Sequence, residues 1–251
     1  MMNDPKKRFT GKGENYVRYR PSYPAGVIQL LTETYGLTPA SVVADVGSGT
    51  GILSALFAAN GSRVYGIEPN EEMRGYAEQT LASEQNFTSV AAPAEATTLP
   101  DSSVDFITAA QAFHWFDIPK AKAEFRRLLR QNGHVVLLWN SVPADDSVHY
   151  AALESFNRKY QIARSWTRGN KDREITRFFD GAVKKYQMAN PQPMDWEGYR
   201  GRFLSSSWAP RPGAADYEPA LADLRQLFDQ LQVSGTLVEP LVTEMYVGQL
   251  P

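Results

Sequence analysis

The sequence contains no cysteine, which excludes disulfide bonds, thiolate catalysis and cysteine-based zinc or iron–sulfur sites. Its three histidines, His114, His134 and His149, include no pair four residues apart, so a histidine metal site is not expected. No segment approaches the run of about 20 apolar residues that a membrane-spanning helix needs. Residues 1–8 are polar and basic, with no hydrophobic stretch behind them. We therefore expect a soluble, cytoplasmic protein without a metal.

The chain also lacks an excess of positive charge, because its net charge is −2. Phosphate backbones and anionic lipid surfaces attract basic proteins, so we expect neither nucleic acid nor membrane as a partner. A small-molecule substrate is the better expectation, for a monomer or a homodimer. With 251 residues, 43% of them hydrophobic, the chain has enough material for one large core, and we expect a single domain over residues 1–251.

What the sequence does contain is an apolar strand that breaks into a glycine-rich turn. Gly47, Gly49 and Gly51 stand at alternate positions before a helical segment. Glycines there permit positive φ angles and close approach of a ligand, and the helix start offers unpaired N–H groups. A dinucleotide-binding turn has the spacing G-x-G-x-x-G, but Ile52 stands where its third glycine is required. The pattern indicates a nucleotide-binding turn of another kind.

Two carboxylates accompany this turn. Asp45 closes the strand before it, where a buried carboxylate is costly unless it is hydrogen-bonded. It can cap the turn by accepting N–H groups, border a ligand, or do both. Glu68 ends the next expected strand, roughly 20 residues after the turn, the position from which a carboxylate accepts ribose hydroxyls. The alternative for Glu68 is a solvated strand end.

Strands and helices alternate in the first part of the chain. Apolar runs predict strands at residues 42–45, 63–68, 87–91, 104–109 and 133–139, and their continuity favours a parallel sheet covered on both faces. A helix is expected to begin at Asp117 as N-cap, with Pro119 in its first turn and Gly133 as its stop. Right-handed crossovers then give a doubly wound α/β sheet.

The second part is more polar and aromatic. We expect helical structure over residues 147–179, a strand at 183–188 and a break at 190–193. A helix at 195–205, an apolar helical stripe at 217–231 and a last strand at 241–250 follow.

The segment from Asp45 to Gly51, D-x-G-x-G-x-G, resembles the first motif of class I S-adenosylmethionine-dependent methyltransferases. Residues 9–24 and 109–116 resemble segments of the methyltransferase-11 type. Residues 109–116 are most similar to its trans-aconitate methyltransferase-like branch. The resemblance implies a Rossmann-like, doubly wound seven-stranded sheet, mostly parallel, with an antiparallel C-terminal strand pair. It also implies an N-terminal lid or helical segment (1–35), a cofactor-binding core (40–140) and a substrate-side insertion with helices (141–240).

The resemblance further implies S-adenosyl-L-methionine as cofactor, with S-adenosyl-L-homocysteine as its product. Asp45 and the glycines would border the methionine part, Glu68 the ribose, and Gln111 the sulfonium. The full set of expected cofactor-binding residues comprises Tyr16, Asp45, Gly47, Ser48, Gly49, Gly51, Glu68, Pro69, Asn70, Met73, Ala94, Glu95 and Gln111.

The expected substrate side includes His114, which follows the fourth strand at the sheet edge where ligands bind. His114 can act as the base that removes a proton from the acceptor, or can form part of the pocket wall. Arg20, Arg200 and Arg202 are candidates for pairing with a substrate carboxylate. The expected substrate-binding residues are Tyr19, Arg20, His114, Trp115, Asn140 and Trp208.

These patterns predict methyl transfer to a small-molecule acceptor by in-line displacement, on oxygen or carbon, with a carboxylate as one candidate acceptor. Enzymes that methylate amide or base nitrogens commonly carry [DNS]-P-P-[YF] after the fourth strand, where this chain has residues 111–114, Gln-Ala-Phe-His. Two alternatives stay open: a non-catalytic module that binds S-adenosylmethionine, and a nicotinamide-dependent oxidoreductase. An N-terminal lid over residues 1–24, with Tyr16, Tyr19 and Tyr23 facing the sulfonium, is a further expectation. The spacing of these tyrosines equally fits a helix that packs on the core.

Overall fold

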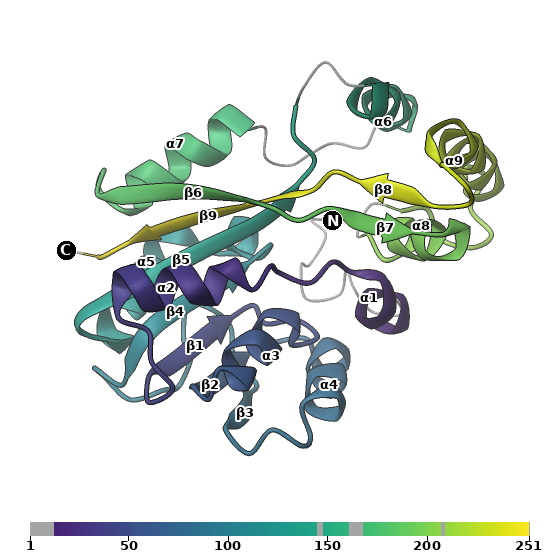
Figure 1. The fold of residues 1–251 in the computed structure, drawn as a ribbon. Helices are drawn as coiled ribbons and strands as arrows, with labels where there is room; N and C mark the ends of the chain where they lie inside the picture. The colour runs from purple at the N-terminus through teal and green to yellow at the C-terminus, as the bar shows by residue number, and fades with distance from the viewer. Residues whose placement is uncertain (1–12, 145–147, 161–167, 207–208, 251) are drawn as a thin grey trace.

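A computed structural model describes residues 13–144, 148–160, 168–206 and 209–250. Its centre is a seven-stranded sheet with the strand order β3-β2-β1-β4-β5-β9-β6 (Figure 1). The strands are β1 (Val42–Val46), β2 (Arg63–Ile67), β3 (Phe87–Val90), β4 (Val104–Ala110), β5 (Leu129–Ser141), β6 (Val183–Ala189) and β9 (Val242–Gly248).

The first five strands pair in parallel, and β9 runs antiparallel between β5 and β6. The predicted sheet, with its antiparallel pair from residues 183–188 and 241–247, is therefore confirmed. Because β1 to β4 are parallel neighbours, the segments that follow each of them lie along one edge of the sheet. That edge brings together residues that are far apart in the sequence.

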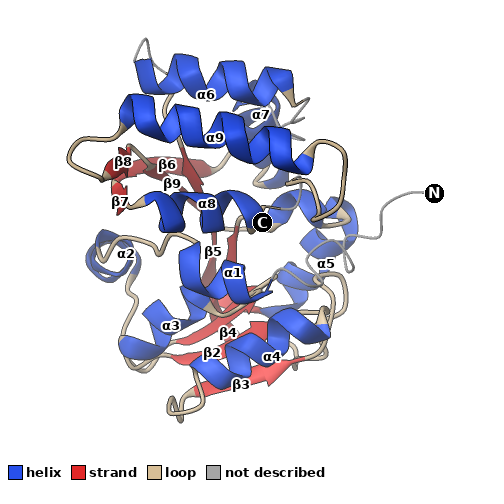
Figure 2. Ribbon diagram, turned by 90° about the vertical axis from the view of Figure 1, so that its right-hand side faces the viewer, coloured by secondary structure: helices blue, strands red, loops and turns tan. Residues whose placement is uncertain are grey.

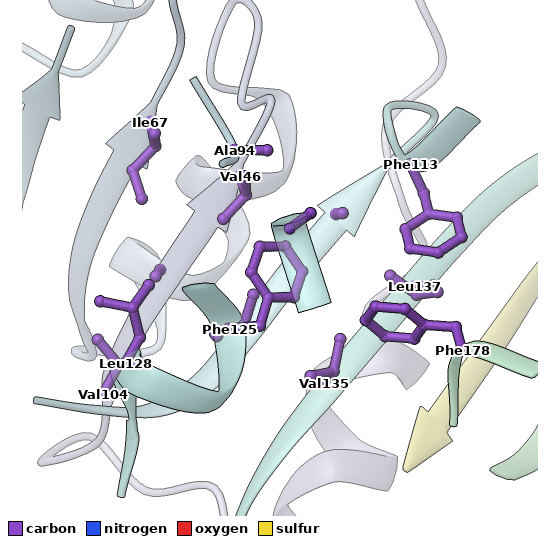
Figure 3. Packing of buried hydrophobic residues seen from close by; sticks show 14 of the residues in the cluster. Val46, Ile67, Ala94, Val104, Phe113, Phe125, Leu128, Val135, Leu137 and Phe178 are labelled. Carbon is purple, nitrogen blue, oxygen red and sulfur yellow. The ribbon is translucent and has the colours of Figure 1, made fainter. Parts of the chain in front are cut away.

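Helices cover both faces of the sheet, as the apolar character of the strands requires. On one face, α2 (Gly26–Tyr35) and α3 (Ile52–Ala59) bury Leu31 and Phe57 against β1 and β4. On the other, α5 (Ile118–Leu128) and α7 (Arg168–Phe178) contribute Phe125 and Phe178 to a second apolar cluster (Figure 3). Helix α4 (Glu71–Thr80) follows β2 and contacts β3.

Helix α5 begins as expected but ends early. The Asp117 side chain accepts a hydrogen bond from the Lys120 N–H at 3.4 Å, and Pro119 stands in the first turn. Gly133 is not the stop, because the helix ends at Leu128 and Gly133 lies inside β5. A Cβ on Gly133 would stand 2.8 Å from Leu129 and 3.1 Å from the Asp105 carbonyl oxygen. Close packing, not helix termination, requires this glycine.

A separate cluster of helices stands above the sheet (Figure 2). It consists of α6 (Val148–Lys159), α8 (Trp196–Leu204) and α9 (Tyr217–Leu231), packed around a third apolar cluster with the two-stranded sheet of β7 (Gln192–Met194) and β8 (Leu237–Glu239). The helical structure expected over residues 147–179 occurs as two helices, α6 and α7, and residues 161–167 lie outside the described residues. The break expected at residues 190–193 includes the start of β7.

In the part of the chain that the structure describes, no helix is both long enough and apolar enough to cross a membrane.

Candidate active site

The glycine turn connects β1 to α3 in a conformation that its glycines make possible. Gly47, Gly49 and Gly51 have φ angles of +69°, +56° and +83°, a region that L-residues with side chains avoid. The N–H groups of Gly47 and Ser48 donate to the Ile67 carbonyl at 2.8 and 3.1 Å, which fastens the turn to β2. A Cβ on Gly47 would stand 2.6 Å from the Cβ of Ala112. The first glycine therefore lets the loop after β4 approach the turn.

Asp45 is held beneath this turn by hydroxyl groups. It is 1% exposed, and it accepts hydrogen bonds from Ser54 Oγ at 2.6 Å and Thr108 Oγ1 at 2.9 Å. Burial raises the pKa of Asp45 to about 6, although these donors favour the charged form. Asp45 thus connects β1, α3 and β4 below the pocket. Its carboxylate accepts mainly from the Ser54 and Thr108 hydroxyl groups, whereas a carboxylate that capped the turn would accept from backbone N–H groups.

Asp45→Asn is expected to remove a pH dependence of stability. The pKa of Asp45 is about 6 in the folded protein and about 3.9 in an unfolded chain. Between about pH 4 and 6 the folded state therefore binds more protons, and the free energy of unfolding falls as pH rises through this window. The fall is on the order of 2 kcal/mol, and asparagine does not titrate there.

Urea unfolding of the cofactor-free protein at pH 4 and at pH 7 measures this effect. The free energy of unfolding of Asp45→Asn minus that of wild type should be about 2 kcal/mol larger at pH 7 than at pH 4. Asp216→Asn, at an exposed aspartate, is the control and should show no such change. A pH-independent difference between Asp45→Asn and wild type would contradict the assigned protonation.

Glu68 follows β2 and reaches back to the turn. Its carboxylate accepts hydrogen bonds from the Gly49 N–H at 3.0 Å and the Asn70 N–H at 2.8 Å. Burial raises the pKa of Glu68, and the two N–H donors act in the opposite direction. A carboxylate has about four acceptor sites, so two remain for a ligand. The alternative of a freely solvated strand end does not describe this side chain.

The residues expected on the adenine side lie around the same edge. Asn70 is the N-cap of α4, where its Oδ1 accepts from the Met73 N–H at 3.0 Å, and Met73 and Ala94 are buried. Pro69 is half-buried between Glu68 and Asn70. Glu95 accepts a hydrogen bond from the Asp117 N–H at 2.7 Å, which ties the loop after β3 to the start of α5.

A pocket of about 470 Å³, part of it open to solvent, lies over the glycine turn. Its lining includes Asp45, the glycine turn, Gln111 and Asn140, and from the N-terminal segment Tyr16, Arg20, Pro21 and Tyr23. Gln111 has a φ angle of +55°, a strained conformation of the kind that concentrates at functional sites. Thr50, 2% exposed, also lines this pocket, and its Oγ1 has no hydrogen-bond partner among the described residues.

Asn140 holds the N-terminal segment against the sheet. Its Nδ2 donates to the Ser22 carbonyl at 3.2 Å, and Asn190 Nδ2 donates to the same oxygen at 2.9 Å. Thr243 Oγ1 donates to Asn140 Oδ1 at 2.5 Å, and Gln111 Nε2 donates to the Asn140 carbonyl at 2.9 Å. Asn140 therefore lines the pocket and also anchors the chain that covers it.

Helix α1 (Gly13–Tyr19) forms a bridge over the sheet edge, since it contacts α4 of the core and α8 of the helical cluster. Tyr16 and Tyr23 line the pocket over the glycine turn, whereas Tyr19 lines a second pocket and packs on Gly201 of α8. The structure thus brings two of the three expected lid tyrosines together. The part of the expected lid at residues 1–12 lies outside the described residues.

Gly201→Ala is expected to loosen α1 without altering the sheet. A Cβ on Gly201 would stand 2.2 Å from two ring carbons of Tyr19, so the ring must move. Overpacking of this kind costs about 1–3 kcal/mol, which corresponds to roughly tenfold or faster hydrogen exchange in α1. Exchange in β1 should stay as it is. Gly75→Ala on α4, where no neighbouring atom lies within 4 Å of the added carbon, is the control and should leave exchange in α1 unchanged. Unchanged exchange in α1 of the Gly201→Ala variant would contradict the contact between Gly201 and Tyr19.

His114 and Trp115 occupy the short helix η2 (Phe113–Trp115) after β4, with their ring centroids 4.6 Å apart. Both are half-buried, and neither is among the described residues that line the two pockets. Arg200 is exposed on α8 and lies outside both linings. Trp208 lies outside the described residues.

Sequence reasoning missed Ser54, Thr108 and Thr50. Ser54 and Thr108 are single hydroxyl residues within otherwise apolar segments of α3 and β4, and both are fully buried. That pattern is a usable signal, because the buried Asp45 carboxylate requires donors from neighbouring elements. Thr50 has no comparable signal, since a threonine inside a glycine turn is ordinary loop composition.

Comparison with known proteins bears directly on this edge of the sheet. The family model described as "Methyltransferase domain" (type 11) matches residues 44–137, from β1 through most of β5. Residues 44–137 are thus similar to a methyltransferase domain. An uncharacterised methyltransferase-like protein of Schizosaccharomyces pombe is 31% identical over 143 residues, which are 57% of this chain and 54% of that protein. An uncharacterised methyltransferase of Mycobacterium tuberculosis is 37% identical over 130 residues, 50% of this chain and 49% of that protein.

The chain spans about half the length of the curated relatives it matches. Solved structures extend the likeness beyond residues 44–137. A candidate type II methyltransferase from Anaeromyxobacter dehalogenans is 26% identical, with a TM-score of 0.64 over 93% of this chain and 99% of that chain. A methyltransferase from Geobacter sulfurreducens, solved with S-adenosyl-L-homocysteine, is 16% identical, with a TM-score of 0.56 over the whole of both chains. The fold is the Rossmann-like methyltransferase fold.

Proposed function

We propose that the protein transfers a methyl group from S-adenosylmethionine to the oxygen or carbon of a small-molecule acceptor. The observation that carries this proposal is the glycine turn with three positive φ angles, bonded to Glu68 at the sheet edge of a methyltransferase domain. Placement in the trans-aconitate methyltransferase-like branch stays a prediction based on residues 109–116. The cytoplasmic location, the single domain and the monomeric or homodimeric state also stay predictions.

The residues around the turn fit the cofactor. The turn places backbone, not side chains, at the pocket floor, and Glu68 has acceptor sites left after its two backbone bonds. Thr50 Oγ1 is a buried polar atom without a partner among the described residues at the same floor. We assign the turn and Asp45 to the methionine part, Glu68 to the ribose, and the residues from Asn70 to Met73 and at Ala94 and Glu95 to the adenine.

The bound cofactor supplies a methyl group that its sulfonium already activates. The chain's own residues then have to hold the acceptor in line and keep water out, which is a matter of positioning more than of covalent catalysis. Gln111 and Asn140 fix the walls, and α1 covers the pocket. An acceptor hydroxyl or carbon acid needs a base, and His114 on η2, although outside the lining of both pockets, stays the residue predicted for that step. An ionised carboxylate acceptor needs none.

Mass spectrometry of a metabolite extract incubated with the protein and methyl-labelled S-adenosylmethionine tests this function. We expect label in one small-molecule product and in no nucleic acid. Tight S-adenosylhomocysteine binding without any labelled product would instead identify a non-catalytic binding module. Thermal stabilisation by NAD, but not by S-adenosylhomocysteine, would identify a nicotinamide-dependent oxidoreductase and overturn the proposal.

A further inference from the structure

Arg20 follows α1 and lines the pocket over the glycine turn. Its guanidinium lies 4.7 Å from the centroid of the Tyr16 ring, and its Nη2 donates to the Ser205 carbonyl at 3.3 Å. Its Nε is buried and has no hydrogen-bond partner among the described residues, and no carboxylate of those residues forms an ion pair with it. A buried donor left without an acceptor is costly, so this position favours a ligand that accepts hydrogen bonds.

The described lining of this pocket contains one side chain of each charge, Arg20 and Asp45. The Asp45 carboxylate accepts hydrogen bonds from the Ser54 and Thr108 hydroxyl groups at 2.6 and 2.9 Å, and it forms no ion pair with Arg20. The two charges are therefore separate features of the pocket. An amino acid carries an ammonium and a carboxylate on one carbon atom, so its two charges match this pair.

The start of α3 also favours an anion in this pocket. Ile52 and Leu53, the first two residues of the helix, belong to the lining. The first N–H groups of a helix have no acceptor within it, and the helix dipole favours negative charge at this end. Arg20 and the start of α3 thus act in the same direction. The methionine part of S-adenosylmethionine, which the proposed function assigns to the turn, carries one carboxylate.

We infer that Arg20 binds this carboxylate, and that it therefore belongs to the cofactor site and not to the acceptor site. This inference rests on the proposed function. A guanidinium matches a carboxylate with two parallel hydrogen bonds, and the unpartnered Nε supplies the donor for one of them. Tyr16 belongs to α1 and Ser205 follows α8, so a carboxylate bound to Arg20 connects both helices to the glycine turn.

Isothermal titration calorimetry with two ligands tests the inference. One ligand is S-adenosylhomocysteine, and the other is decarboxylated S-adenosylhomocysteine, which has a hydrogen atom where the carboxylate stands. Both are titrated into wild type, Arg20→Met, Arg20→Lys and Arg18→Met. Arg18 lies on α1, is exposed and lines only the second pocket, so its variant removes the same charge from the same segment.

Arg20→Met should weaken S-adenosylhomocysteine binding about tenfold or more, since it removes a charged hydrogen-bond partner. It should not weaken binding of the decarboxylated ligand, whose ammonium group is repelled by the Arg20 guanidinium. That unchanged or improved affinity also shows that the variant is folded. Arg20→Lys should lose less than Arg20→Met, because lysine keeps the charge but not the two-pronged geometry. Arg18→Met should keep both affinities within about threefold, because salt screens an exposed charge.

Equal weakening of both ligands by Arg20→Met would show that Arg20 supports the pocket without binding the carboxylate, and would overturn the inference. An S-adenosylhomocysteine affinity that Arg20→Met leaves unchanged would also overturn it. Both results would leave the proposed function in place. Absence of S-adenosylhomocysteine binding to the wild-type protein would instead overturn the proposed function and with it this inference.

Discussion

Gly49→Val is expected to nearly abolish S-adenosylhomocysteine binding, with a loss of about 100-fold or more. Gly49 has a φ angle of +56°, and a β-branched residue in that region is a backbone outlier. An added Cβ would meet only Met73 Cε, at the ordinary contact distance of 3.7 Å, so the core leaves room for it. The turn must therefore change its conformation, and the Gly49 N–H then loses its bond to Glu68.

Isothermal titration calorimetry with S-adenosylhomocysteine measures this loss. Gly36→Val is the matched control: Gly36 also has a positive φ angle, +72°, and no atom lies within 4 Å of an added Cβ, but it caps α2 outside the pocket lining. It should lose stability and keep the wild-type affinity. Equal S-adenosylhomocysteine affinities of Gly49→Val and wild type would show that the glycine turn is not part of the binding site.

Glu68→Ala is expected to weaken S-adenosylhomocysteine binding by tens of fold. The expected loss follows from removing a charged hydrogen-bond partner, on the order of 2 kcal/mol. The two N–H groups that now hold the carboxylate, from Gly49 and Asn70, fix its orientation toward the ligand. Alanine removes the proposed ribose acceptor and the bond from the Gly49 N–H, while the bonds of Gly47 and Ser48 to the Ile67 carbonyl remain.

Calorimetry under the same conditions measures this variant, with Glu71→Ala as its control. Glu71 lies three residues further on, exposed in the first turn of α4, so its removal subtracts the same charge without touching the turn. The control should keep the wild-type affinity. A Glu68→Ala protein that is folded and binds as tightly as wild type would show that this carboxylate does not hold the ribose.

The residues expected to hold the cofactor lie at one edge of the sheet because most of them follow strands. A motif such as D-x-G-x-G-x-G fixes a local backbone shape, and parallel strand order places the segments after β1 to β4 along one edge. Asp45, the three glycines, Glu68 and Gln111 are therefore assembled by topology alone. The spacing of the glycines predicted the turn and the apolar runs predicted a parallel sheet, whereas the seven strands and the antiparallel pair were implied by the resemblance.

The substrate side was less predictable because it depends on contacts between distant segments. Three arginines looked equivalent in the sequence, yet Arg20 joins the two pockets, Arg202 pairs with Glu239, and Arg200 is exposed. The separation of Tyr19 from the other tyrosines comes from Gly201, 182 residues further along the chain (201 minus 19). No local periodicity carries such information.

Gly133 illustrates a different source of error. A glycine after an amphipathic helix commonly marks a helix end, and the sequence offered no reason to assign it otherwise. In the structure the helix ends at Leu128, and the glycine is needed where β5 passes close to the carbonyl of Asp105. The same residue type serves both purposes, and only the register of β4 with β5 distinguishes them.

A crystal structure of the full chain with S-adenosylhomocysteine bound tests the central claim most directly. We expect the ligand over the glycine turn, with both ribose hydroxyls within hydrogen-bond distance of the Glu68 carboxylate and the amino-acid part beside Gly47 and Asp45. A ligand bound away from the turn, or a ribose out of reach of Glu68, would contradict the assignment of this edge of the sheet as the cofactor site.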